Sequence, residues 1–91
     1  MVRFEWDPRK AKLNVRKHRV SFEEAETAIL DELSKTTPDP DHSLKENRFI
    51  TLGVSARRRL LVVCYTHRGE SIRIINARAV TKREREIYEE H

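Results

Sequence analysis

Alternating apolar and charged positions open the chain and predict a short strand over residues 2–6. A helix is expected to follow at once. Asp7 can serve as its N-cap, because a carboxylate at that position accepts hydrogen bonds from otherwise unpaired backbone N–H groups. Pro8 suits the first helical position, where its missing N–H has no partner to lose. This first helix is predicted to end near His18.

A second helix is predicted to begin at about Phe22. Ser21 and Glu24 have the spacing of a capping box, in which the two side chains satisfy backbone N–H groups at a helix start. Val20, before the cap, can contact Ala25 as a hydrophobic staple. Apolar residues then recur at helical spacing and predict one stripe that packs on a sheet: Phe22, Ala25, Ala28 and Ile29.

Two prolines and their polar neighbours predict that residues 36–47 form the main exposed loop. Three strands are expected after it, over residues 48–54, 59–66 and 71–78. The links between these strands are only a few residues long, so the strands must be antiparallel neighbours in a meander. The near-continuous apolar run 60–64 predicts that the middle strand is the most buried.

A last helix is predicted over residues 82 to about 90, because Thr81 and Glu84 repeat the capping-box spacing. The predicted order is thus a strand, two helices, three antiparallel strands and a helix. This order indicates an α+β fold in which helices pack on a small sheet. No internal repeat or linker divides residues 1–91, which are expected to form a single domain.

Composition narrows the class of protein. With 91 residues, 37% of them hydrophobic and 37% charged, the chain can build one small core. Cys64 is the single cysteine, which excludes a scaffold stapled by internal disulfides. The longest apolar run, residues 60–65, is far shorter than the roughly 20 residues that cross a bilayer. The first residues have no apolar stretch of signal-peptide length, so a cytoplasmic protein is expected.

Charge weakly favours an anionic partner. Nineteen basic and fifteen acidic residues give a net charge of +4, with the four histidines counted neutral. A well-solvated small domain with no nucleic-acid partner explains that sum equally well. The distribution is more informative, because basic residues crowd the last third of the chain: residues 57–59, Arg68, Arg73, Arg78, Lys82, Arg83 and Arg85.

Motifs along nearly the whole chain resemble one bacterial family. In the first part they are Phe4-Glu5-Trp6-Asp7, Lys10-Ala11, Asn14, Lys17-His18 and Val20-Ser21-Phe22-Glu23-Glu24-Ala25. In the later part they are Glu46, Arg48, Gly53, Ser55, Leu60, Val62, Thr66, Arg68-Gly69, Ile72-Arg73-Ile74-Ile75, Ala77-Arg78-Ala79, Glu84-Arg85 and Tyr88-Glu89. Together they resemble the BrnT family of bacterial toxins.

The resemblance implies a RelE-like fold and a ribonuclease that inhibits translation and growth until an antitoxin binds it. It also implies that the antitoxin is a BrnA-like ribbon-helix-helix protein, that toxin and antitoxin form a two-to-two heterotetramer, and that DNA is bound only through the antitoxin. Two positions depart from the family pattern. Arg19 stands where the family usually has a glycine after the first helix, and Asn76 stands where a serine is common.

Metal-free RNA cleavage drives a 2′-hydroxyl onto the adjacent phosphate, which requires a proton acceptor, a proton donor and positive charge. The planar arginine fork matches phosphate oxygens, so Arg68 and Arg78 are predicted to clamp the phosphate. In a regular strand, Arg73 and Arg78 would lie on opposite faces. Each of these arginines could equally be an ordinary surface residue or an ion-pair partner.

Four further residues are candidates for the catalytic set. His42 can take and give a proton near neutral pH, and Glu46 could act as a base, although it could instead pair with Arg48. The last helix could deliver Arg85 and Tyr88 to RNA, as the resemblance implies. Alternatively, Arg85 forms an intrahelical ion pair with Glu89 while Tyr88 packs as core.

A polar stripe along the first helix could contact RNA or a partner through Lys10 and Lys17, which are included in the predicted RNA-binding set. The same stripe could instead be a solvated helix face, an interpretation that suits Lys10 slightly better. Asn14 and His18, on the same helix, could instead hydrogen-bond inward and fix it to the sheet. Outside this helix, three basic residues complete the predicted RNA-binding set: Arg48, Arg57 and Lys82. No metal-ligand spacing and no glycine-rich phosphate loop occur, so no metal or other cofactor is expected.

Two functions of different classes remain open. The first is a ribonuclease toxin, whose phosphate chemistry needs Arg68, Arg78 and Arg85 to converge. The second is a non-catalytic module that pairs with the antitoxin and modulates its operator binding, which tolerates dispersal of these arginines.

Overall fold

The computed structural model describes residues 2–39 and 47–90, which form one α+β domain built around a single five-stranded sheet. The helices are α1 (Pro8–His18), α2 (Phe22–Ile29) and α4 (Lys82–Glu89). The strands are β1 (Arg3–Glu5), β2 (Lys35–Pro38), β3 (Arg48–Val54), β4 (Leu60–Arg68) and β5 (Ser71–Ala79). None of the helices in these ranges is long and apolar enough to cross a bilayer.

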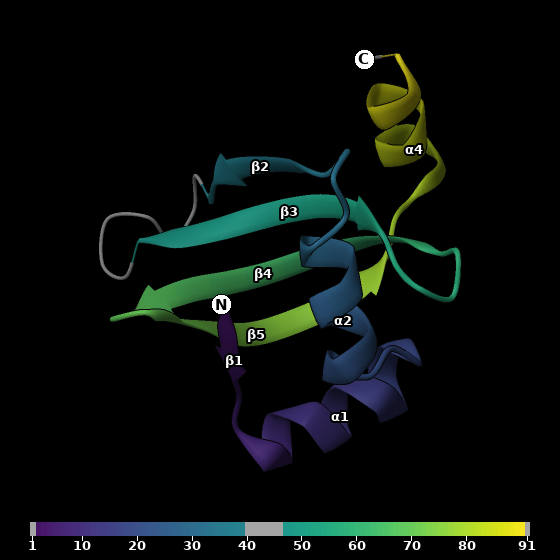
Figure 1. Cartoon of the computed structure of the whole chain (residues 1–91). Coiled ribbons are helices and arrows are strands. Elements are labelled where there is room, and N and C mark those ends of the chain that lie inside the picture. Colours follow the sequence, from purple (N-terminus) through teal and green to yellow (C-terminus); the bar gives the residue numbers. More distant parts are fainter. Residues whose placement is uncertain (1, 40–46, 91) are drawn as a thin grey trace.

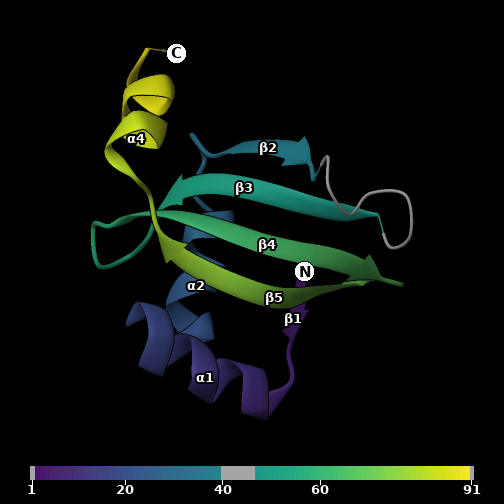
Figure 2. The same ribbon diagram turned by 180° about the vertical axis from the view of Figure 1, so that it is seen from behind.

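The sheet is mixed, with strand order β1-β5-β4-β3-β2. The predicted antiparallel meander is confirmed as β3, β4 and β5. It is not the whole sheet, because β1 adds in parallel to one edge of β5 and β2 adds antiparallel to β3 at the other edge. Helix α2 lies across one face, α1 lies beside β5, and the other face carries no helix across β3, β4 and β5 (Figures 1 and 2).

The prediction of one exposed loop over residues 36–47 is wrong at its start. Residues 36–38 pair with β3 as part of β2, and the Thr36 and Thr51 hydroxyls lie 2.7 Å apart. Asp39, the next residue, is buried. Proline is tolerated here because β2 is an edge strand, which does not need every N–H for pairing. Residues 40–46 of the predicted loop lie outside the described residues.

The core lies between α2 and the sheet. Val20, Phe22, Ala25 and Ala28 are fully buried, so the predicted stripe and staple positions face inward. They pack against the matching face of β4 and β5, formed by Leu61, Val63, Tyr65, Ile74 and Ala77. Gly53 allows α2 to approach β3, because a Cβ there would collide with the carbonyl oxygen of Ala28.

Asn14 joins α1 to the edge of β5. Strand β1 pairs only with residues 71–73, so the rest of that edge needs another hydrogen-bonding partner. The Asn14 amide provides it, since Nδ2 donates to the Ala77 carbonyl at 2.8 Å and Oδ1 accepts from the Ala77 N–H at 3.1 Å. Nδ2 also donates to the Val20 carbonyl at 2.9 Å. The expectation that Asn14 fixes the helix to the sheet is confirmed.

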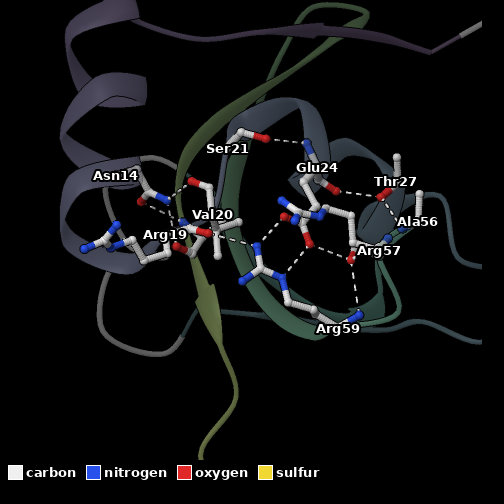
Figure 3. Close-up of polar contacts among 11 residues, drawn as sticks. Asn14, Arg19, Val20, Ser21, Glu24, Thr27, Ala56, Arg57 and Arg59 are labelled. Atoms are coloured by element: carbon white, nitrogen blue, oxygen red, sulfur yellow. Dashed lines mark hydrogen bonds and ion pairs between the residues drawn. The ribbon is translucent and has the colours of Figure 1, made fainter.

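The junction between α1 and α2 is held by an ion pair between the buried Glu24 and the partly exposed Arg59 (Figure 3). The Ser21 hydroxyl accepts from the Glu24 N–H at 3.0 Å, but the Glu24 carboxylate does not complete the predicted capping box. It accepts from Arg59 Nε at 2.9 Å and from the Ser55 hydroxyl at 2.7 Å. The hydrogen bond from Arg59 is the main reason that the pKa of Glu24 lies below its ordinary value.

Arg19 adopts the left-handed conformation that a glycine would occupy at this helix end, with φ 60° and ψ 31°. Its N–H donates to the Val15 carbonyl at 2.9 Å, and its own carbonyl accepts from Arg59 Nη2 at 2.9 Å. The cap geometry therefore survives the replacement of the usual glycine. Arg59 and the helix junction hold the backbone in place.

Candidate functional site

A β-bulge decides which side chains of β5 share a face. Cys64 pairs with Asn76 and Tyr65 pairs with Ile74, which leaves Ile75 as an extra residue between them. Because Tyr65 and Ile74 belong to the core, the partners of Cys64 and its even-numbered neighbours point to the opposite, open face.

Arg73 and Arg78 consequently lie on the same face of the sheet. Arg73 pairs with Thr66 and Arg78 pairs with Val62, both on the open face. The prediction that these arginines occupy opposite faces is wrong, because it assumed a regular period of two across residues 73–78. Arg73 is engaged by Glu5, with Nη1 and Oε2 at 3.2 Å.

The predicted phosphate clamp of Arg68 and Arg78 does not form one site. Arg68 pairs with Ser71 at one end of the β4–β5 ladder, and Arg78 pairs with Val62 at the other. The two pairs are six residue steps apart along β4, which is about 20 Å. The prediction that Arg68, Arg78 and Arg85 converge on one site is therefore wrong.

An open groove of about 930 Å³ runs between α1 and the open face of β5. Its described lining contains no acidic residue, and cationic side chains reach it from both elements. Leu13, which is 60% exposed, contributes an apolar patch. The lining residues are Lys10, Leu13, Asn14, Arg16, Lys17, His18, Ile75, Asn76 and Arg78.

The groove brings three of the predicted functional residues together: Lys10 and Lys17 from the RNA-binding set, and Arg78 from the catalytic set. Asn76 was not predicted as a groove residue, although the period of two places it on the face of Arg78, because the residue pattern does not show that α1 lies beside β5. The sequence offered His18 either as part of the helix stripe or as an inward hydrogen-bonding residue, and the structure places it in the groove lining. An imidazole side chain therefore lies beside the cations of the groove.

Arg78 is the most constrained cation of the groove. Its Nη1 and Nη2 donate to the two carboxylate oxygens of Glu84 at 2.8 and 2.9 Å, and Nη1 also donates to the Ala79 carbonyl at 3.2 Å. Glu84 simultaneously completes the predicted capping box of α4, accepting from the Thr81 N–H at 2.8 Å. The hydrogen bonds from Arg78 lower the pKa of Glu84 to about 2, so this carboxylate is ionised at neutral pH.

Helix α4 does not carry its predicted catalytic residues to the groove. Tyr88 lies by the β2 edge, where its carbonyl accepts from Lys35 Nζ at 3.3 Å and its ring lies 5.3 Å from the same ammonium. Arg85 is exposed and does not line the groove. Among the described residues it also forms no ion pair with Glu89, so the predicted intrahelical pair is absent.

Arg57 and Lys82, from the predicted RNA-binding set, are both exposed and lie outside the groove lining. Arg57 occupies the turn between β3 and β4, where its N–H donates to the Ser55 hydroxyl at 3.2 Å. Lys82 begins α4.

A second polar cluster lies at the other end of the open face. Arg48 begins β3 opposite Thr66, and the Cys64 thiol lies 3.8 Å from a carboxylate oxygen of buried Asp39. Burial, and then the negative charge of Asp39, raise the pKa of the Cys64 thiol, so this cysteine is not an activated nucleophile. His42 and Glu46, the predicted acid-base pair, lie outside the described residues.

His67 does not lie on the open face. It pairs with Ile72 on the core side and makes edge-to-face ring contacts with Phe49 and Tyr65, with centroids 5.2 and 5.8 Å apart. Within residues 2–39 and 47–90, no three side chains of the metal-ligating types gather to hold an ion.

Known proteins share this architecture. The crystal structure of the ribonuclease toxin BrnT from Brucella abortus superposes with a TM-score of 0.71 at 20% sequence identity, over 90% of this chain and 100% of that one. At this identity the likeness shows the fold. No curated protein sequence matches the chain. Residues 6–84 match the model of a family described as the ribonuclease toxin BrnT of type II toxin–antitoxin systems, and the chain therefore belongs to the BrnT family of ribonuclease toxins.

Proposed function

We propose that this protein is a metal-independent endoribonuclease that cleaves cellular RNA in the cytoplasm and so inhibits translation and growth. Membership of a type II toxin–antitoxin family implies an RNA substrate and an antitoxin partner. We also propose that cleavage needs no metal, that the protein is related to RelE-like toxins, and that the residues named below form the site.

The observation that carries the proposal is the cationic groove between α1 and β5. Lys10, Lys17 and Arg78 line it together, and no described lining residue is acidic. A phosphodiester backbone requires such a surface, because each neutralised phosphate releases bound counterions. The described part of the lining holds no Phe, Tyr or Trp side chain on which a base could stack, so contacts to phosphate dominate.

In the proposed reaction, the 2′-oxygen attacks the adjacent phosphorus as its proton passes to a base. The bond to the 5′-oxygen breaks, that oxygen receives a proton, and a cyclic phosphate is left on the upstream strand. Arg78 stabilises the added negative charge on the phosphoryl oxygens. His18 supplies an imidazole to the described groove lining and is a further candidate for proton transfer. His42 and Glu46 remain the proton-transfer candidates from the sequence.

The remaining predicted residues have roles outside the groove. Arg68 and Arg48 lie at the other end of the open face, where an RNA strand following the sheet would reach them. Arg57, Lys82 and Arg85 add exposed positive charge around the β3–β4 turn and α4, and Tyr88 lies on the same helix. We propose that all of them bind RNA flanking the cleaved phosphate rather than form the catalytic centre.

We further propose that a BrnA-like ribbon-helix-helix antitoxin neutralises the protein in a two-to-two heterotetramer, and that DNA is contacted through the antitoxin. Co-expression followed by light scattering tests this arrangement. A one-to-one complex, or direct operator binding by the isolated chain, would contradict it.

The decisive experiment is cleavage of a long mRNA by the purified, partner-free protein, with and without EDTA. A Lys10→Ala/Lys17→Ala variant is compared with an Arg9→Ala/Lys12→Ala variant, which removes the same charge from the exposed side of the same helix. Cleavage that survives EDTA, is lost in the groove variant and persists in the control supports the proposal. Equal loss in both variants would show that only net charge matters.

A specific observation also favours the second candidate, a non-catalytic module that pairs with the antitoxin. Arg68 and Arg78 lie about 20 Å apart along the ladder, and such dispersal is compatible with binding alone. Absence of cleavage by the wild-type protein, even with ribosomes added, combined with altered operator affinity of the antitoxin, would establish this alternative.

A further inference from the structure

The Arg78–Glu84 pair leaves one edge of the guanidinium open. An arginine carries five N–H donors, arranged as an end edge (Nη1 and Nη2) and a side edge (Nε and Nη2). Glu84 occupies the end edge with both carboxylate oxygens, and the Ala79 carbonyl takes the other Nη1 hydrogen. Within the described residues, the Nε hydrogen and the second Nη2 hydrogen of Arg78 have no protein partner.

The open edge belongs to a side chain that lines the groove and is about one third exposed, at 37%. Two parallel N–H donors match two oxygens of a phosphodiester, the geometry that makes arginine a strong phosphate ligand. A carboxylate on the end edge does not block this second edge. Glu84 can thus hold Arg78 while Arg78 binds an anion.

The Glu84 side chain is itself held in one orientation by the start of α4. Its carboxylate accepts from the Thr81 backbone N–H at 2.8 Å, and this contact sets its rotamer. The Thr81 hydroxyl, by contrast, accepts from the Glu84 backbone N–H at 3.2 Å and does not touch the carboxylate. The chain of contacts therefore runs from the start of α4 through Glu84 to the guanidinium. Holding a long side chain in one orientation removes the rotamer entropy that binding would otherwise cost.

We propose that Glu84 is a positioning residue that presents the Nε/Nη2 edge of Arg78 to an RNA phosphodiester in the groove. The RNA identity of this ligand rests on the proposed ribonuclease function, whereas anion binding at the edge does not. Glu84 touches neither the phosphate nor the reacting atoms in this role.

The test follows the Nε–H signal of Arg78 by NMR during titration with inorganic phosphate, the signal being assigned by its loss in Arg78→Lys. In the wild-type protein, phosphate should shift this signal with saturation. In Glu84→Gln, whose amide presents one acceptor rather than two, binding should weaken roughly tenfold. The same variant should lower kcat/KM for mRNA cleavage by a similar factor.

Thr81→Ala is the matched control. It removes the hydroxyl of the capping box and lowers Tm, but it keeps the Thr81 N–H bond to the Glu84 carboxylate and both Arg78–Glu84 bonds. Phosphate affinity should therefore be unchanged in Thr81→Ala. In an Arg78→Lys background, Glu84→Gln should have no further effect on cleavage, because the edge it positions is absent.

Three outcomes would overturn the inference: unchanged or tighter phosphate binding in Glu84→Gln, equal weakening in Thr81→Ala, or no phosphate-dependent shift of the wild-type signal. Failure of the proposed function has a different signature. Wild-type protein would then leave mRNA intact while the Arg78 signal still responds to phosphate and still depends on Glu84.

Discussion

Replacing Asn14 by alanine should destabilise the protein more than any other single loss of a polar side chain from α1. Asn14 is 6% exposed, and its amide makes three hydrogen bonds to the backbone of Val20 and Ala77, both fully buried. In Asn14→Ala, one N–H and two carbonyl groups lose their partner. The edge of β5 that β1 leaves unpaired would lose the contact that replaces a neighbouring strand.

The magnitude follows from these three groups. A buried backbone group left without a partner costs about 1–3 kcal/mol, and some relaxation is expected, so the total should be about 3–5 kcal/mol. A domain of this length has a free energy of unfolding of roughly 5–14 kcal/mol. The substitution should therefore remove a large share of the stability and lower Tm by at least about 12 °C.

Urea unfolding followed by circular dichroism measures the difference directly. Asn76→Ala is the control, because Asn76 is an exposed residue of the same type on β5, and its loss should change stability by less than about 0.5 kcal/mol. A loss below about 1 kcal/mol in Asn14→Ala would refute the reasoning, since it would mean that water or a shifted β5 edge satisfies the three groups.

Three further predictions concern charge and backbone geometry. Lys10→Ala/Lys17→Ala should make single-stranded RNA binding less dependent on salt. The magnitude of the slope of log K against log salt should fall by about 1.4, because each lysine gives up one phosphate contact. An unchanged slope would show that RNA binds elsewhere. Because the folded pKa of Glu84 is lowered from 4.5 to about 2, its ionised form stabilises the protein above pH 4.5, and this contribution is lost as pH falls from about 4.5 to 2. Acid unfolding of Glu84→Gln should be correspondingly less steep in that window, and identical curves would contradict the ion pair. Arg19→Gly should raise stability by about 0.5–1 kcal/mol in urea unfolding, because glycine adopts φ 60° without strain.

Local signals in the sequence were sufficient to predict most helices and strands. The caps at Asp7, Ser21 and Thr81 each accept the hydrogen bond expected at a helix start. The meander follows from short links and apolar runs, which are also local. The second half of the Ser21 capping box failed because Arg59, 35 residues away, binds the Glu24 carboxylate. That ion pair depends on tertiary contact, which spacing alone does not encode.

One edge strand was missed and the pairing of the other was not predicted, both because they depend on contacts between distant segments. The β2 segment Lys35–Pro38 is polar and contains proline, so only its pairing with β3 makes it a strand. The strand Arg3–Glu5 was predicted, but its parallel pairing with β5 joins segments 68 residues apart, as in the pair of Glu5 with Arg73. Such long-range pairing depends on the topology of the whole chain.

The candidate site required both topology and the bulge. Lys10 and Lys17 could be predicted as one helix stripe, but their approach to Arg78 depends on α1 lying along β5, where Asn14 binds the strand edge. Without the extra residue Ile75, the pattern places Arg73 and Arg78 on opposite faces, whereas the observed register turns both outward. The same shift keeps Ala77 in the core opposite Val63. The extra residue Ile75 thus turns Arg78 toward the groove, while Ala77, next to Arg78, binds Asn14 and so holds α1. Both walls of the groove therefore depend on the register of β5.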